Sequence, residues 1–89
     1  ISEMLAVFET GVRYQMYHAL ALLVTGALTP RVRGRAVVAA GWLFVVGIVL
    51  FSGSLYALAT TGVTVLGAIT PIGGVAFLAG WAALAVSAF

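Results

Sequence analysis

FETGVRYQMYHALALL, residues Phe8 to Leu23, gathers Glu9, Arg13, Tyr14, Gln15, Tyr17 and the only histidine, His18, in a chain that is largely apolar. Of the 89 residues, 64% are hydrophobic and only 7% are charged, whereas a soluble domain carries about 25% charged residues. So few charges cannot cover a surface that faces water, which makes a lipid bilayer the expected solvent. The composition therefore predicts an all-α, polytopic transmembrane helical bundle.

Three stretches are long enough to cross a hydrocarbon core of about 30 Å as helices. We expect spans at about residues 10–28, 36–60 and 71–88, within a single transmembrane domain that covers residues 1–89. The third span begins with a good pair of start residues, Thr70 as the N-cap and Pro71 at the first helical position.

The loop between the first two spans, residues 29–35, contains the only dense charge of the chain: Arg31, Arg33 and Arg35. Cytoplasmic loops of membrane proteins are enriched in arginine and lysine. We therefore expect this loop to lie on the cytoplasmic side of a bacterial inner (plasma) membrane. The observed N-terminus is then outside, and the C-terminus inside.

A helical projection divides the first span into a polar and an apolar half. Two neighbouring i, i+4 rows form the polar half: Glu9, Arg13 and Tyr17 in one row, and Thr10, Tyr14 and His18 in the other. Polar side chains are costly against lipid. We therefore expect this half to face other helices or a wet cavity.

Two ionisable groups in this half have more than one reading. Glu9 and Arg13 have the spacing of an intrahelical ion pair, which fixes the depth of the helix; alternatively, Arg13 binds an anionic headgroup or ligand. His18 lies about 15 Å from the end of its span. An ionisable residue at this depth is a candidate proton relay or ligand site, or a neutral histidine that is bonded to a Tyr, a Ser or a backbone carbonyl.

Depth links the first two spans. In an antiparallel hairpin, Ser52, Ser54 or Tyr56 falls near the level of Arg13 and Tyr14. The alternative is that the serines bond carbonyls of their own helix. The candidate polar cluster is therefore Glu9, Arg13, Tyr14, Gln15, Tyr17, His18, Ser52, Ser54 and Tyr56.

Small residues predict where helices approach closely, because interfaces between membrane helices are enriched in Gly and Ala. The candidate packing positions are Gly47, Gly53, Gly73, Gly74, Ala76 and Gly80. Ala76 and Gly80 form a small-xxx-small pair.

Several classes of function lack the residues that they need. The chain has no Cys, one His and two acidic residues, so we expect no metal site and no cofactor. Neither a nucleophile motif nor a phosphate-binding loop is present, and no basic stripe suggests a nucleic-acid partner. We therefore expect a protein that is not an enzyme.

Three strings in this order carry a family resemblance: FETGVRYQMYHALALL, then FSGSLYALATTGV at residues 51–63, then LGAITPIGGVAFLAGW at residues 66–81. The chain resembles the domain-of-unknown-function 423 family of small integral membrane proteins, which also contains transmembrane protein 256-like members. The resemblance implies four helices in the complete protein, the first with a Gly-, Ala- and His-containing segment that this chain lacks. It implies no reaction.

Two hypotheses of function remain. The first is a structural or accessory module that packs against other membrane-protein subunits or against itself. The alternative is binding or transport of a small molecule, lipid or proton through a polar cavity lined by the first helix. The two are separated by whether the polar half of that helix is closed by hydrogen bonds or open.

Overall fold

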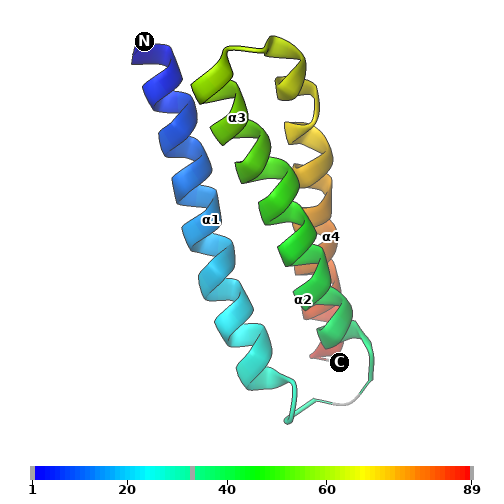
Figure 1. Ribbon diagram of the computed structural model, residues 1–89. Coiled ribbons are helices and arrows are strands. Elements are labelled where there is room, and N and C mark those ends of the chain that lie inside the picture. The colour runs from blue at the N-terminus through cyan, green and yellow to red at the C-terminus, as the bar shows by residue number, and fades with distance from the viewer. Residues whose placement is uncertain (1, 33, 89) are drawn as a thin grey trace.

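The computed structural model describes residues 2–32 and 34–88, which form an elongated helical bundle of 46 × 19 × 13 Å (Figure 1). No strand occurs among these residues. The elements are α1 (Ser2–Leu28), α2 (Ala36–Gly47), the π-helical η1 (Ile48–Ser52), α3 (Gly53–Thr61), the 3₁₀-helical η2 (Thr64–Ala68) and α4 (Thr70–Ser87). The all-α prediction is confirmed.

Within the described residues, two helical stretches are long and apolar enough to cross a membrane, Ala36–Thr61 and Thr64–Ser87. The first of these runs without a break through α2, η1 and α3. The helices that the sequence predicts at 36–60 and 71–88 are thus present with nearly the same bounds.

The first helix differs from its expected bounds. It starts at Ser2 rather than near residue 10 and has 27 residues. The physical reason is that residues 2–9 are mostly good helix formers and include no Pro or Gly, so nothing interrupts the helix. α1 is long enough to span a bilayer, but its polar stretch keeps it outside the group of sufficiently apolar helices.

The connections follow from glycine and proline. Gly34 (φ 97°) and Gly62 (φ 71°) have left-handed backbones, which glycine adopts without steric cost. The Gly62 N–H donates to the carbonyl of Leu58 at 2.8 Å and so ends α3. Arg31 and Arg35 are exposed, while Arg33, the third predicted topology residue, lies outside the described residues.

Thr70 does not cap α4, contrary to the prediction. The N-cap is Ile69, which makes no side-chain capping bond, and Thr70 is the first helical residue. The Thr70 hydroxyl instead pairs with the Ser54 hydroxyl at 2.6 Å. The Thr70 hydroxyl is therefore bonded to the neighbouring helix and does not cap α4.

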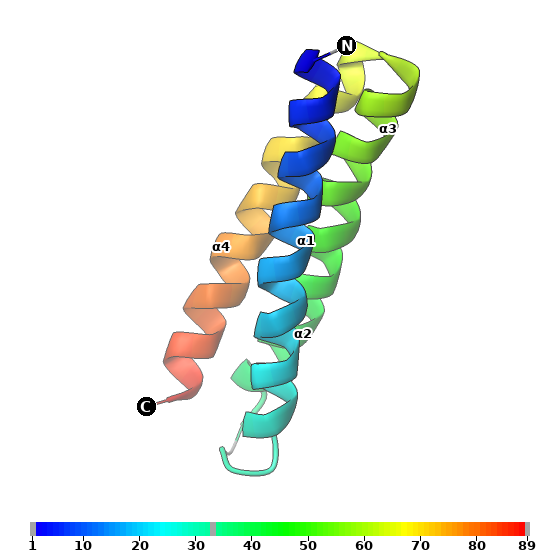
Figure 2. The same cartoon turned by 90° about the vertical axis from the view of Figure 1, so that its left-hand side faces the viewer.

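The helix 36–61 is the centre of the bundle. α4 packs mainly along α2 and η1, and α1 packs along α2, η1 and α3. The backbones of α1 and α4 rarely approach each other. Figure 2 shows the C-terminal end of α4 directed away from α1.

Aromatic rings seated on glycines join α2 to α4. Phe44 is fully buried, and its ring lies against Gly80. A Cβ added to Gly80 would stand only 2.8 Å from the ring carbons of Phe44. In the reverse direction, the Phe77 ring of α4 occupies the space beside Gly47 of α2. The prediction of close approach is thus correct for Gly47 and Gly80.

The other predicted packing positions vary. Gly73 lies directly against the backbone of Phe51, as predicted. A Cβ on Gly53 would meet nothing within 4 Å, and one on Gly74 would make only an ordinary contact, 3.9 Å from the Phe51 ring. Gly53 and Gly74 are therefore not needed for close packing inside this bundle. Ala76 is half-buried.

Candidate functional site

His18 is the buried polar centre of the bundle, with 5% of its surface exposed. Its Nε2 lies 3.1 Å from Nε1 of Trp81 on α4, and its Nδ1 lies 2.8 Å from the carbonyl oxygen of Tyr14. The indole N–H can only donate, so Nε2 accepts. Nδ1 then carries the hydrogen and donates to the carbonyl. The surroundings therefore hold a neutral imidazole in one tautomer.

Aromatic rings from all three long helices enclose this imidazole. The Phe77 ring stacks on it with centroids 3.6 Å apart and planes within 9°. Phe44 and Trp81 approach at 5.7 and 5.9 Å, and Tyr14 packs against Phe51 at 4.6 Å. The tilted and edge-on contacts of Phe44 and Trp81 are of the kind that stabilises a buried aromatic cluster. The side chains of α1 and α4 thus meet although their backbones stay apart.

A lateral groove of about 470 Å³ reaches this cluster between α1 and α4. Its lining is aromatic and aliphatic, with Tyr14 and His18 on one side and α4 on the other. The full lining is Tyr14, His18, Phe51, Pro71, Gly74, Val75, Phe77, Leu78 and Trp81. We call this the α1–α4 groove.

Ser52 and Tyr56 join the middle helix to α1. The Ser52 hydroxyl donates to the carbonyl of Gly11 at 2.8 Å, and the Tyr56 hydroxyl donates to Oε1 of Gln15. These acceptors flank Arg13 and Tyr14, as the depth comparison predicts. Ser54 follows the alternative, because its hydroxyl bonds the carbonyl of Phe51 in its own helix as well as Thr70.

The two polar rows of α1 separate. His18 is buried, and Tyr14 of the same row takes part in the aromatic cluster. Glu9 and Arg13 bond each other at 2.6 Å, but each side chain is 61% exposed, and Tyr17 is exposed beside them. The described helices therefore leave the Glu9–Arg13–Tyr17 row, which we call the outer polar row, uncovered, and its expected contact with other helices or a wet cavity stays a prediction.

The buried stripe of α1 explains this separation. It consists of Gly11, His18, Ala21 and Thr25, which repeat at helical spacing and lie about 80° to 160° around the helix from Arg13. Small residues in this stripe admit the neighbouring helix. Arg13 and Glu9 neutralise each other locally and so can remain outside.

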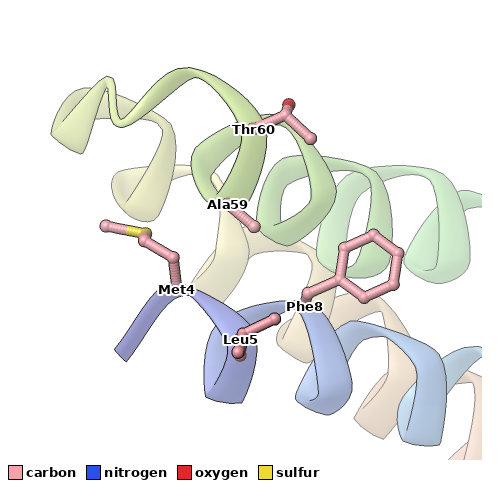
Figure 3. Close-up of a pocket in the computed structure, with 5 residues that line it drawn as sticks. All are labelled: Met4, Leu5, Phe8, Ala59 and Thr60. Carbon is pink, nitrogen blue, oxygen red and sulfur yellow. The ribbon is translucent and has the colours of Figure 1, made fainter. Parts of the chain in front are cut away.

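A second groove of about 490 Å³ lies at the start of α1, and Figure 3 shows its lining. Met4, Leu5 and Phe8 of α1 face Ala59 and Thr60 near the end of α3. The lining is almost entirely apolar and holds no ionisable group, so this groove is not a candidate for chemistry.

The chemistry available in the described residues is limited. No group of three or more His, Cys, Asp or Glu side chains comes together there. Every buried side-chain nitrogen and oxygen that is described has a hydrogen-bond partner. The arrangement binds and positions helices, and it presents no activated nucleophile.

Sequence reasoning missed most of the partners of His18. Phe44, Phe51 and Phe77 look like ordinary apolar residues in their spans. Trp81 is a large residue on a helix of mostly small ones, which does not by itself indicate a partner. A usable signal was the glycine spacing, since Gly47 and Gly80 each leave room for a ring on the facing helix.

Comparison with known proteins agrees with a membrane location. The UPF0382 membrane protein YwdK of Bacillus subtilis is 54% identical over 85 residues, which are 94% of this chain and 69% of that protein. A UPF0382 membrane protein of Staphylococcus haemolyticus is 51% identical over 85 residues, 96% of this chain and 69% of its own. A third, from Staphylococcus epidermidis, is 52% identical over 83 residues, 93% and 67% of the two chains.

No solved structure matches the chain. The family match covers residues 1–74 and is described as protein of unknown function (DUF423). The match includes α1 and the whole middle helix, so it takes in His18, the outer polar row and the glycine-seated aromatic residue Phe44. Together with the identity to the three membrane proteins, this match shows that the chain belongs to the DUF423 family.

Proposed function

We propose that this protein is a non-enzymatic structural or accessory subunit that packs into a larger membrane complex, or against copies of itself, through the outer polar row of α1. The observation that carries the proposal is the Glu9–Arg13 pair. Each of the two side chains is 61% exposed, and the helices that pack beside α1 are apolar enough to cross a membrane.

The proposed membrane arrangement has α1 as a third span beside the two sufficiently apolar helices. A charged side chain inside a bilayer costs several kcal/mol unless it is paired or covered. The pairing of Glu9 with Arg13 lowers part of this cost. In the proposal, a protein surface that covers the outer polar row removes the remaining cost. The complete protein has four spans in this proposal.

Orientation and location follow from charge. The loop 29–35 is cytoplasmic in the proposal because Arg31 and Arg35 are exposed at one end of the bundle. The membrane is the bacterial inner (plasma) membrane, in line with relatives from Bacillus and Staphylococcus that are named membrane proteins.

Transport through a polar cavity lined by α1 has less support. A proton relay needs a histidine nitrogen that can exchange a proton with a neighbour, but both ring nitrogens of His18 are bonded within the protein. The groove that reaches His18 lies between α1 and α4, and its lining is mostly aromatic and aliphatic.

The test is the mass of the native particle. The protein is extracted from its membrane in nanodiscs, and we expect a reproducible particle whose protein mass corresponds to more than one copy of the chain. The double variant Glu9→Gln/Arg13→Gln removes the charges without leaving one unpaired, and we expect it to lose the assembly.

Leu23→Ala is the matched control, because Leu23 is exposed on the apolar side of α1. It should retain the full mass. A wild-type particle that contains a single chain would refute the proposal, and so would a double variant that assembles like the wild type.

A further inference from the structure

We propose that the α1–α4 groove is the seat of a further transmembrane helix, contributed by the part of the longer DUF423 proteins that lies outside the region matched here. This inference rests on the proposed spanning arrangement of α1. It adds where the additional helix lies and which residues it covers.

The arrangement of helices leaves one side of the bundle unfilled. α1 and α4 both pack on the helix 36–61, yet their backbones rarely meet. Long side chains bridge the interval: Phe77 and Trp81 of α4 reach His18. These side chains form the floor of a groove of about 470 Å³, which leaves room for further atoms above them.

The walls of the groove suit another helix. Gly74 lines it, but a Cβ on Gly74 would make only ordinary contacts within this chain. Packing inside this bundle therefore does not require a glycine at position 74. Small residues on membrane helices let a neighbouring backbone approach closely. Val75 and Leu78 flank Gly74 on the same helix and are exposed, as residues that pack against an additional helix would be.

The relatives have enough additional chain. The matched 85 residues are 69% of the Bacillus subtilis protein, so roughly 40 of its residues lie outside the match, twice the ~20 that a spanning helix needs. A helix also suits the depth of the groove, since only structures with internally satisfied backbones cross a bilayer.

A helix in this position would complete a four-helix bundle and cover His18. It would close the lateral path by which lipid can reach the imidazole and Trp81. The Glu9–Arg13 pair lies outside the groove, so the outer polar row would remain available for the proposed assembly.

The experiment compares two positions that are equally exposed here. Leu78 lines the groove and Leu23 does not, and each is 71% exposed. Because the chain has no Cys, Leu78→Cys and Leu23→Cys can each be spin-labelled singly and studied in nanodiscs by electron paramagnetic resonance. The same pair is made at the aligned positions of the full-length Bacillus subtilis protein, after any native cysteine is replaced.

In the 89-residue chain we expect mobile spectra at both positions. In the full-length relative we expect a loss of mobility at the position aligned with Leu78 and none at the position aligned with Leu23. Equal mobility at both positions of the full-length protein would overturn the inference.

Two other occupants give distinct results that also overturn it. If a second copy fills the groove, immobilisation falls when excess lipid dilutes the protein to one copy per nanodisc. If a lipid-soluble small molecule fills it, immobilisation is lost on exhaustive detergent washing. None of these readings depends on particle mass, so failure here is distinguishable from failure of the proposed assembly.

Discussion

His18 is held by partners that also define its chemical form. The Trp81 N–H occupies the Nε2 lone pair, and the Tyr14 carbonyl takes the hydrogen on Nδ1. A buried polar group that loses its partner costs about 1–3 kcal/mol. His18 thus joins α1 to α4 through Nε2.

Trp81→Phe tests this role at a single atom pair. The variant keeps an aromatic ring near Phe44, which Trp81 meets edge-on at 5.0 Å, but removes the N–H that satisfies Nε2. We expect the free energy of unfolding to fall by about 1 kcal/mol. The measurement is reversible unfolding in mixed micelles by titration with a denaturing detergent.

Trp42→Phe is the control, because Trp42 is exposed on α2 and should tolerate the change. In a His18→Phe background, the Trp81→Phe effect should largely disappear, since the acceptor is gone. An undiminished effect in that background would show that the indole acts through packing rather than through the hydrogen bond.

Helix packing between α2 and α4 depends on rings that enter the space left by glycines. Gly80 receives Phe44, and Gly47 receives Phe77, so each helix supplies both a ring and a notch. The reciprocal arrangement fixes the depth of one helix against the other, because a shift along the axis would drive a ring into a backbone.

Gly80→Ala should therefore destabilise the bundle. The added Cβ would stand 2.8 Å from the Phe44 ring, which is fully buried and cannot move away freely. Overpacking of this kind costs about 1–3 kcal/mol. Gly53→Ala is the matched control in the same bundle, since its Cβ would meet nothing within 4 Å.

We expect Gly53→Ala to be neutral or to stabilise by up to about 1 kcal/mol, because alanine is the better helix former. Both variants are measured by the same detergent titration. Equal effects at the two positions would mean that close packing at Gly80 is not what holds α4 in place.

The sequence predicts the helices well and their facing less well. Length, apolarity, Pro and Gly determine where the helices 36–61 and 70–87 begin and end, and these properties are local. The side of α1 that packs against the other helices is not determined by local sequence. It depends on Gly11 and Ala21 admitting the neighbouring helix, and the polar pattern alone points about 70° away from that stripe.

The candidate site divides in the same way. The i, i+4 spacing is sufficient to predict the Glu9–Arg13 pair, and helix rise is sufficient to predict that Ser52 reaches α1. The partnership of His18 with Trp81 joins residues 63 positions apart in the chain. It requires the relative rotation of two helices, which a single sequence does not specify.

At the scale of the whole molecule, the two ends of the bundle differ in charge. The loop after α1 and the C-terminal end of α4 lie at one end, and the start of α1 lies with the α3–η2 turn at the other (Figure 1). The loop end carries exposed Arg31 and Arg35. The opposite end has no charge at residues 61–63 and carries the acidic Glu3 in the first turn of α1. By the positive-inside rule, we expect the end that carries the arginines to face the cytoplasm.

The last prediction concerns orientation. A fluorescent protein fused after residue 89 should fold in the cytoplasm and fluoresce, whereas alkaline phosphatase fused there should be inactive, because it matures only outside. Replacing Arg31, Arg33 and Arg35 by Asn removes the charge asymmetry, so we expect a mixed population with activity from both reporters. Replacing Arg13 by Gln instead should leave the orientation unchanged, since Arg13 is neutralised by Glu9 within α1. If the triple variant kept the wild-type ratio of the two reporters, the loop arginines would not be the determinant of orientation.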